Sequence, residues 1–389
     1  MNTSNNVVPY WRLSGFYFFY FASLGAMLPY WSAYLFSLDF NARDIGELVA
    51  ILMLTKIVSP NVWGWIADHT GKRMAIVRLG SLCAIIAFTA ILFVSSYWWI
   101  AVVMLLYSFF WNATLPQFEA TTFSYLGSRV NQYSNIRLWG SIGFIVAVWL
   151  LGLSIEQWSV VIVPYTLIIL FVSIWVMSLL VPESAAGHLS LDHQPLKKIL
   201  QRPVVAGLLL SCFLMQASHG AYYVFYTPYM IEHGYSMTSI GSLWALGVIA
   251  EVIVFIFMSR LLHKFSLRHL ILFSLFVAVV RWVLLSIFVD QLFVVVLIQL
   301  MHAATFGIYH VAAIHLIHIY FPGRHQGKGQ ALYSSLSFGA GGALGSYVSG
   351  ISWDTLGSNL TFVIAAGLAF MGLVIAFLYV KDSNSTVVV

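Results

Sequence analysis

Long uninterrupted apolar runs dominate this sequence and limit what it can fold into. Residues 77–96 read VRLGSLCAIIAFTAILFVSS, in which Arg78 is the only charged side chain. A helix needs about 20 such residues to cross a bilayer, whereas the strands of a membrane β-barrel alternate between polar and apolar residues. Charged residues make up 8% of the chain, against roughly 25% in a soluble domain. The sequence therefore predicts an all-α membrane protein, and it excludes soluble enzymes, nucleic-acid binders and disordered scaffolds.

The apolar runs of the 389 residues divide into twelve predicted transmembrane helices. No cleavable signal peptide is expected before the first of them. The predicted spans are 11–37, 45–66, 74–94, 97–125, 134–154, 158–180, 203–230, 240–260, 268–288, 291–319, 331–352 and 358–380.

The basic residues predict the orientation of these helices. With the N-terminus inside the cell, fifteen of the 18 Lys and Arg lie on the cytoplasmic side or at the adjoining helix ends. Arg43 alone lies outside, and Lys56 and Arg281 lie in mid-membrane. Lys and Arg concentrate in cytoplasmic loops of membrane proteins. Both termini are therefore expected in the cytoplasm, for a multi-pass protein of the plasma membrane, which is the inner membrane in bacteria.

The chain also contains an internal repeat. A shift of 195 residues places IGELVA (45–50) on IGSLWA (240–245), and GAMLPYWSAYL (25–35) on GAYYVFYTPYM (220–230). Repeats of this kind indicate two similar halves related by an axis along the membrane normal. The predicted organisation is a six-helix half at 1–181, a cytoplasmic linker at 182–202 and a second six-helix half at 203–389.

The loop after the second predicted helix carries a recognisable motif. GWIADHTGKR (64–73) resembles the GxxxDxxGRR signature of the major facilitator superfamily. Span number, repeat and orientation extend the resemblance to the whole chain. It implies alternating access, in which two halves rock about a substrate site near the bilayer midplane. It also implies a cytoplasmic gate formed by Asp68, Gly71, Lys72 and Arg73, although an ordinary basic loop is the alternative.

A closer resemblance, to the lactose-permease branch of that superfamily, involves the fourth and fifth helices. The segments LPQFEATTF (115–123) and IRLWGSIGF (136–144) reproduce its spacing of an Asn seven residues before a Glu and an Arg 18 residues after that Glu. The resemblance implies substrate contacts from Asn112, Glu119 and Arg137.

Phe144 occupies the position at which that branch stacks an aromatic ring on its substrate. Within the branch, three segments are most similar to the phenylpropionate-permease group, a proton symporter group: VIAEV (248–252), VVRW (279–282) and QLMHAATF (299–306).

Charged residues inside the membrane are costly, at least about 2.5–3.5 kcal/mol each on insertion scales, and are functional candidates for that reason. Lys56 and Glu251 are one repeat apart and lie about 17 Å into their helices at 1.5 Å per residue. Lys56 is expected to contact substrate. A static ion pair is the alternative for these two residues, as it is for Glu119 and Arg137.

The resemblance assigns Arg281 and His302 to a proton-coupling cluster. The lactose-permease branch has an acidic proton carrier three residues after this histidine, where the present sequence has Thr305. Glu251 is then the carboxylate expected to carry the proton. Burial favours its neutral acid, and an approaching arginine favours the carboxylate.

Several other polar residues are expected to be structural. Asp44 and Glu47 have the spacing of a capping box at the start of the second helix. The two cysteines lie in separate apolar runs and are expected to pack as free thiols. The tenth helix holds four histidines without Asp, Glu or Cys, so no metal site is expected. They are His302, His310, His315 and His318.

These observations predict a secondary active transporter that imports a small organic solute together with protons. The sequence contains no phosphate loop for ATP, and no cofactor is expected. The positive charges in mid-membrane favour an organic anion such as an aromatic carboxylate. The alternatives are a sugar or nucleoside proton symporter and a proton-driven drug exporter. An intramembrane acyltransferase would need an HxxxD or HExxH motif at membrane depth, and neither occurs within the predicted spans. The expected partners are the substrate, protons and lipid, with no nucleic acid, and the protein is expected to be a monomer.

Overall fold

The computed structural model describes residues 8–183 and 197–381, and nearly all of these residues are helical. They form two compact units. The first unit contains α1 to α6 together with Tyr226–Ala245, and the second contains α8 up to Phe225 and the chain from Leu246 onward. Most of the predicted linker 182–202 lies outside the described residues, and the half boundaries predicted above stay a prediction.

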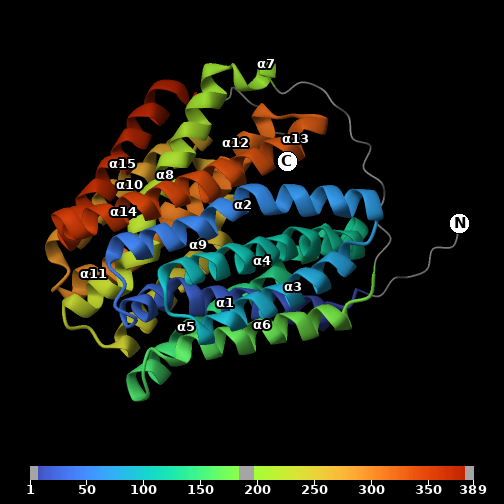
Figure 1. The fold of residues 1–389 in the computed structure, drawn as a ribbon. Coiled ribbons are helices and arrows are strands. Elements are labelled where there is room, and N and C mark those ends of the chain that lie inside the picture. The colour runs from blue at the N-terminus through green and yellow to red at the C-terminus, as the bar shows by residue number, and fades with distance from the viewer. Residues whose placement is uncertain (1–7, 184–196, 382–389) are drawn as a thin grey trace, which may run out of the picture. The chain divides into compact units, whose positions relative to one another are not determined.

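In the first unit, α1 packs against α5 and α6, and α4 packs against α2 and α3. Figure 1 shows α2, α4, α3 and α6 running side by side. The helices are α1 (Tyr10–Phe36), α2 (Ala42–Thr70), α3 (Arg73–Thr89), η1 (Ala90–Phe93), α4 (Tyr97–Leu126), η2 (Gly127–Gln132), α5 (Tyr133–Gln157) and α6 (Ile162–Leu180).

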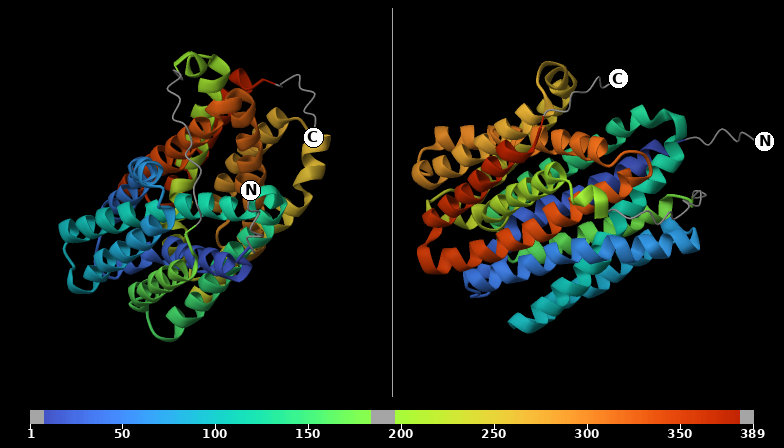
Figure 2. Two further views of the ribbon diagram at one scale, coloured as in Figure 1. Left: turned by 90° about the vertical axis from the view of Figure 1, so that its right-hand side faces the viewer. Right: turned by 90° about the horizontal axis from the view of Figure 1, so that it is seen from above.

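In the second unit, α10 packs against α15 and α12, and α14 packs against α15. The view from above in Figure 2 shows the red α15 beside the gold α10. After the short α7 (Lys197–Leu200), the helices are α8 (Pro203–Glu232), α9 (Met237–Lys264), α10 (Leu267–Phe288), α11 (Leu292–Leu300), η3 (Ala303–Ile308), α12 (Tyr309–Tyr320), η4 (Gly323–His325), α13 (Gln326–Ser334), η5 (Ser335–Gly341), α14 (Gly342–Leu356) and α15 (Ser358–Tyr379).

The predicted fold class is confirmed. Within the described residues, nine segments are long and apolar enough to cross a membrane, and one of them, Tyr97–Gln157, contains both α4 and α5. With α1 and the continuous α13, η5 and α14, the helices make up the twelve spans of an all-α membrane protein.

Equivalent helix crossings in the two units support the internal repeat. Gly25 of α1 lies so close to α5 that an added Cβ would be 2.6 Å from the carbonyl oxygen of Phe144. Gly220 of α8, one repeat later, meets the backbone of Gly345 in α14 in the same way. Small residues let helix backbones approach closely in membranes. The repeat therefore preserves a backbone contact as well as a hydropathy pattern.

The predicted capping box at Asp44 is wrong. Helix α2 begins three residues earlier than that pattern implies, because the side chain of Asn41 accepts the backbone N–H of Asp44 at 2.8 Å. Ser236, one repeat later, accepts the backbone N–H of Ser239 at 3.2 Å. Glu47 instead accepts hydrogen bonds from Arg43 at 3.0 Å and from the Tyr97 hydroxyl at 2.7 Å.

The tenth and eleventh predicted helices are not regular α-helices. Each is interrupted by a π-helical segment, η3 in the tenth and η5 in the eleventh. The eleventh also begins at Gln326, before the predicted residue 331. A π-helical turn changes which residues share a helix face and often occurs at functional sites. In η3 it lies between His302 and Tyr309.

Candidate substrate and proton sites

Arg137 provides an uncommitted cation in the first unit. Its guanidinium carbon lies 3.6 Å from the centroid of the Phe21 ring on α1 and 5.9 Å from that of Tyr17. Among the described residues the guanidinium has no hydrogen-bond or ion-pair partner. An aromatic face attracts a cation without occupying its N–H groups. The planar fork of Arg137 thus remains available to a ligand.

Glu119 on α4 lies within electrostatic reach of Arg137, but the two form no direct ion pair in the described structure. The carboxylate accepts a hydrogen bond from the Tyr133 hydroxyl at 3.0 Å instead. Tyr133 begins α5, one turn before Arg137. The sequence pattern did not single out this tyrosine, because nothing in its spacing distinguishes it from other aromatics near helix ends.

Asn112 and Lys56 lie where α4 meets α2. The Asn112 amide donates to the Thr55 hydroxyl at 2.9 Å, and the Thr55 hydroxyl lies 2.9 Å from that of Ser108. Buried polar contacts of this kind join membrane helices. The next residue, Lys56, is half-buried and has no hydrogen-bond or ion-pair partner among the residues described. Arg137 and Lys56 are thus two cations on helices of the first unit that have no hydrogen-bond or ion-pair partner among the described residues.

Phe144, the predicted stacking residue, is buried in the contact between α5 and α1. Its side chain is 9% exposed and its backbone lies against Gly25. Phe144 therefore has a packing role, and its stacking on a substrate stays a prediction.

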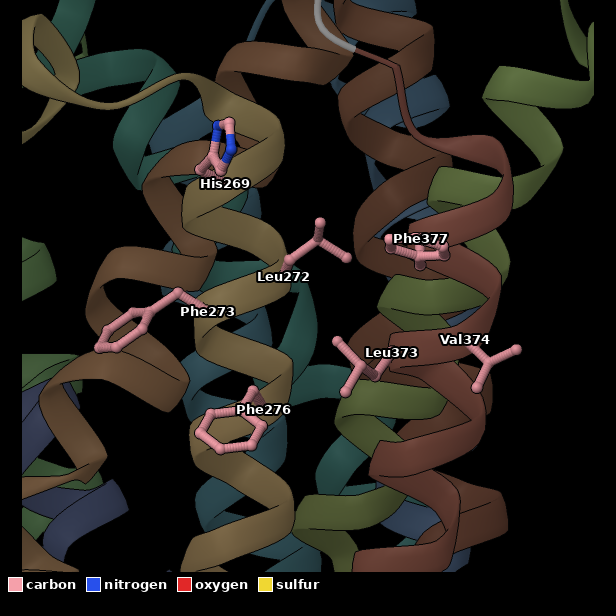
Figure 3. Close-up of a pocket in the computed structure, with 7 residues that line it drawn as sticks. All are labelled: His269, Leu272, Phe273, Phe276, Leu373, Val374 and Phe377. Carbon is pink, nitrogen blue, oxygen red and sulfur yellow. The ribbon is translucent and has the colours of Figure 1, made fainter.

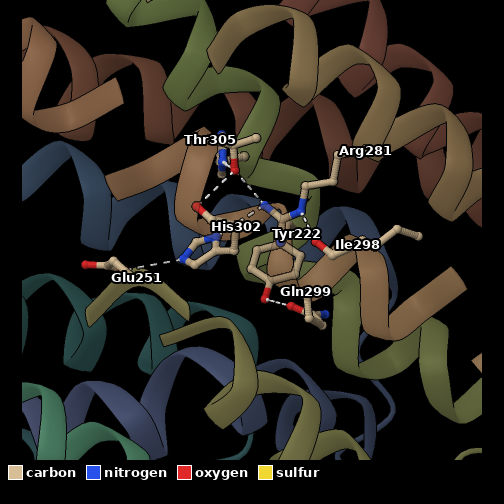
Figure 4. A network of polar contacts seen from close by, with 8 residues as sticks. Tyr222, Glu251, Arg281, Ile298, Gln299, His302 and Thr305 are labelled. Atoms are coloured by element: carbon tan, nitrogen blue, oxygen red, sulfur yellow. Dashed lines mark hydrogen bonds and ion pairs between the residues drawn. The ribbon is translucent and has the colours of Figure 1, made fainter. Parts of the chain in front are cut away.

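The second unit holds an arginine that the protein bonds on several sides (Figure 4). Arg281 on α10 is completely buried. Its Nε donates to the carbonyl of Ile298 at 3.0 Å, and its Nη1 donates to His302 Nδ1 at 3.2 Å and to Thr305 Oγ1 at 3.0 Å. Its guanidinium also lies 4.5 Å from the centroid of the Tyr222 ring. Arg281 is thus fixed by groups from α8, α11 and η3, and by His302 between the last two.

The structure brings together the three residues expected to couple protons. His302 lies between the other two: its Nδ1 accepts from Arg281, and its Nε2 lies 3.7 Å from Glu251 Oε2. The side chains of His302 and Glu251 are 8% and 14% exposed. Figure 4 shows the Glu251 carboxylate on the side of the imidazole away from the guanidinium.

Three further residues of this cluster were not identified from the sequence as members of it. Thr305 accepts from Arg281, and the Tyr222 hydroxyl donates to Gln299 at 2.8 Å beside the Arg281 guanidinium. The signal for Thr305 was its place at the position of the acidic carrier in the lactose-permease branch. Tyr222 and Gln299 had no such signal, because aromatics are common in these helices and an amide carries no charge.

The signature loop between α2 and α3 forms a compact polar turn. Gly71 ends α2 at φ 67°, a left-handed conformation that glycine adopts without strain. Asp68 and Arg73 form an ion pair at 3.6 Å. The backbone N–H groups of Met74 and Ala75, at the start of α3, donate to Glu183 at 3.0 and 3.3 Å.

Glu183 is another residue that the sequence pattern did not identify. It follows α6 and is far from the signature loop in sequence, yet its carboxylate occupies the helix N-terminus, where negative charge is favoured. The backbone N–H of Lys72 donates to the Thr70 hydroxyl at 3.4 Å, and its side chain has no hydrogen-bond or ion-pair partner among the described residues.

An apolar groove of the second unit lies between α10 and α15 (Figure 3). Its lining is apolar apart from His269, and it includes the exposed rings of Phe273, Phe276 and Phe377. Such a surface suits lipid chains. Within the described residues, no group of three or more His, Cys, Asp or Glu is placed to hold a metal ion.

Charged residues inside bundles of apolar helices, and a crossing repeated in two units, are features of a membrane transporter. The fold has close counterparts among solved transporters. A crystal structure of a point mutant of the nucleoside transporter NupG matches with a TM-score of 0.86 and 17% identity over 96% of this chain and 100% of that chain. The POT family transporter PepTSo matches with a TM-score of 0.75 and 10% identity, over 97% and 98%. At such identities the likeness establishes the fold alone.

The family is established by sequence. The model of the MFS_1 like family matches residues 10–364, so this chain belongs to that family and is a multi-pass transporter of the major facilitator type. A protein of Escherichia coli (strain K12) named "Probable 3-phenylpropionic acid transporter" is 28% identical over 90% of this chain and 92% of its own length. The maltose permease of Geobacillus stearothermophilus is 22% identical over 95% and 94%. The resemblance to the phenylpropionate-permease group is thereby confirmed.

Proposed function

We propose that this protein is a proton symporter that imports a small organic anion, of the aromatic carboxylate class, by alternating access. The observation that carries the proposal is the Arg137 guanidinium, held over the Phe21 ring with no hydrogen-bond or ion-pair partner among the described residues. A planar fork of this kind binds a carboxylate through two parallel hydrogen bonds. The rings around it favour a substrate with an aromatic or other flat apolar part.

The second unpartnered cation supports the same substrate class. Lys56 lies inside the helical bundle of the first unit, and the only carboxylate identified near either cation in the described chain is Glu119, which accepts from Tyr133. An unpaired charge inside a membrane protein is costly. An anionic substrate would offset that cost for both cations, whereas a neutral sugar would not.

The proton site of the proposal is Glu251. It faces the side of His302 away from Arg281, within a cluster that holds all three residues. A carboxylate in a nearly buried site can alternate between its neutral and charged forms when its surroundings change. His302 and Arg281 would then influence how readily Glu251 binds and releases its proton. In the lactose-permease branch the proton carrier is an acidic residue three positions after the histidine. In this chain that position is Thr305, whose side chain is neutral.

The name of one relative agrees with this substrate class, and the name of another differs from it. The 28% identical relative is named for 3-phenylpropionic acid, an aromatic monocarboxylate. The maltose permease, at 22% identity, favours a sugar as the second candidate. The hydrogen-bonded Glu119 and Tyr133 would suit sugar hydroxyls, so the two candidates are tested side by side.

A ligand panel measured by thermal shift in detergent tests the substrate class. We expect 3-phenylpropionate to raise the Tm of the wild-type protein and to have no effect on Arg137→Lys, which keeps the charge and loses the fork. The alcohol 3-phenylpropan-1-ol, which keeps the ring without the carboxylate, is the matched control and should have little effect. A Tm increase with maltose or a nucleoside and none with aromatic carboxylates would replace the anion by the sugar or nucleoside class.

The direction of transport and the orientation of the protein in the membrane are parts of the same proposal. External acid should stimulate uptake into cells if the protein imports with protons, and should reduce it if the protein is a proton-driven exporter. We further propose that both termini lie in the cytoplasm, and that Asp68, Gly71, Lys72 and Arg73 belong to the cytoplasmic gate. Labelling of single cysteines at either terminus from outside intact cells would contradict this orientation.

A further inference from the structure

His219 and Thr305 form a buried contact beside the Arg281 cluster that no part of the proposed function uses. Both side chains are completely buried. His219 comes from α8 and Thr305 from η3, and His219 Nε2 lies 3.4 Å from Thr305 Oγ1. The hydroxyl also lies 3.0 Å from Arg281 Nη1. The donors and acceptors of these groups determine the direction of the hydrogen bonds between them.

The hydrogen-bond direction can be assigned first at His219. Its Nδ1 lies 2.8 Å from the carbonyl oxygen of Met215, and a carbonyl oxygen only accepts, so Nδ1 carries a hydrogen. Burial beside the Arg281 guanidinium favours the neutral ring, which has one N–H. His219 Nε2 is therefore an acceptor, and the single hydrogen of the Thr305 hydroxyl has two acceptors at 3.4 Å, this nitrogen and the carbonyl oxygen of His302. The oxygen of that hydroxyl then presents its lone pairs to Arg281.

The hydrogen-bond direction at His302 follows from its contact with Arg281. A guanidinium only donates, so Thr305 Oγ1 and His302 Nδ1 both accept from its Nη1. The single hydrogen of a neutral His302 must then be on Nε2, the nitrogen 3.7 Å from Glu251. Figure 4 shows this order from Thr305 through the guanidinium and the imidazole to the Glu251 carboxylate.

We propose that Thr305, oriented by His219 and by the His302 carbonyl, is a positioning residue that keeps Arg281 on Nδ1 of His302 and so fixes His302 as a neutral ring with its N–H on Nε2, the nitrogen that faces Glu251. His302 cannot take a second proton while Arg281 donates to its remaining lone pair. Of His302 and Glu251, Glu251 is then the one that exchanges a proton. This inference rests on the proposed proton coupling for its importance in transport, whereas the ring form of His302 is a property of the protein alone.

The other groups around the cluster do not provide an alternative charge for His302. Tyr222 of α8 lies with its ring 5.8 Å from the His302 ring and donates its hydroxyl to Gln299. Tyr223, also on α8, is within electrostatic reach of Glu251. On η3 itself Phe306 stacks on His302 at 5.6 Å. Glu251 is thus the carboxylate identified at the imidazole, and Arg281 is the cation.

The ring form of His302 can be measured directly. The full-length protein labelled with ¹⁵N-histidine would be examined by NMR, with His302→Gln used to identify the signals of this residue. In the wild type we expect the Nε2–H form from about pH 8 to about pH 5, the range in which an ordinary histidine changes charge. An Nδ1–H form, or a doubly protonated ring within that range, would overturn the proposal.

Two substitutions test the role of Thr305. Thr305→Val removes the hydroxyl and keeps the shape, and should raise the population of the other ring forms at least about tenfold, the effect of losing one hydrogen bond to a charged group. Thr305→Ser keeps the hydroxyl and should give the wild-type spectrum. If Thr305→Val does not fold, Thr305→Ala replaces it. A wild-type spectrum in the folded variant without a hydroxyl would overturn the role of Thr305.

Transport measurements then separate this inference from the proposed function. In vesicles, Thr305→Val should lose the acid stimulation of uptake, and Thr305→Ser should keep it. A wild-type protein with the expected ring form but without acid-stimulated uptake of any tested solute would contradict the proposed symport and leave the positioning role intact. Acid stimulation unchanged in a Thr305→Val protein with altered ring forms would show that the positioning has no part in coupling, and would overturn that part of the inference.

Discussion

Each unit contains an arginine within its apolar helices, and the two arginines have opposite surroundings. Arg137 lies over an aromatic ring and has no hydrogen-bond or ion-pair partner among the described residues. Arg281 is completely buried and donates to a carbonyl, a histidine and a threonine. The same residue type therefore serves two purposes: an arginine with unused donors can bind an anion, and one whose donors are held by the protein organises its neighbours.

The carboxylates follow the same division. Glu119, near Arg137, is held by the Tyr133 hydroxyl, whereas Glu251 faces Nε2 of an imidazole whose Nδ1 is bonded to Arg281. Substrate recognition would thus lie with the first unit and proton exchange with the second. This division is directly testable, because it predicts a different kind of defect for each charged residue.

The largest effect is expected for Arg281→Lys, because the change removes buried hydrogen bonds. Lysine keeps the charge but cannot donate to three acceptors in the directions of a guanidinium. Losing two of the three bonds to this charged group should lower the free energy of unfolding by about 3–6 kcal/mol. A much lower Tm in detergent and loss of uphill transport are the expected results. A Tm equal to that of the wild type would mean that Arg281 is not a structural centre of the second unit.

Glu251→Gln should abolish uphill accumulation and leave exchange intact. The permanently neutral amide resembles the protonated acid, so the carrier should still move substrate down its own gradient. The measurement compares pH-driven accumulation with substrate exchange in the same vesicles. Glu119→Gln, the matched change in the first unit, should instead weaken binding. Accumulation against a gradient by Glu251→Gln would place the proton elsewhere, with Glu119 the first alternative.

Arg137→Lys should give a binding defect without a stability defect. The loss of a bidentate contact to a carboxylate is expected to weaken substrate affinity by about 10- to 100-fold, from about 1.5–3 kcal/mol per charge-assisted hydrogen bond. The protein should be expressed normally and keep its Tm without ligand, in contrast to Arg281→Lys. Undiminished affinity in Arg137→Lys would assign this arginine a structural role and remove the difference between the two units.

The sequence predicted this architecture well because hydropathy and repeats depend on many residues at once. The resemblance to the lactose-permease branch placed Arg281 and His302 in one cluster, and Glu251 was the remaining carboxylate, because ionisable residues in apolar helices are few. Neutral partners carry no such signal: Tyr133, Tyr222 and Gln299 have no charge that would single them out. The π-helical segments η3 and η5 were missed for a related reason, because an apolar pattern does not distinguish a π turn from an α turn.

Helix ends show the limit of local patterns in another way. Asp44 and Glu47 fit a capping box, yet Asn41 provides the cap, and Glu47 bonds Arg43 and Tyr97. Glu183 caps α3 from more than a hundred residues away. A pattern over four residues cannot include a partner that the fold brings in from another helix.

The smallest effect is expected at the signature loop, outside both charged sites. Asp68→Asn removes an ion pair with Arg73 that is partly exposed, and such pairs contribute at most about 1 kcal/mol. We expect transport rates to change by up to about fivefold, because the loop should act on closure of the inner side. Substrate affinity should stay the same, because the loop forms no hydrogen bond or ion pair with Arg137 among the described residues. Glu183→Gln is the matched change, since it neutralises a carboxylate of the same loop cluster while leaving the Asp68–Arg73 pair in place. If Asp68→Asn vesicles transport at the wild-type rate, the signature is an ordinary basic loop. If affinity falls instead of rate, the loop is linked to the substrate site, and the separation of binding, coupling and gating among three places in the molecule would have to be given up.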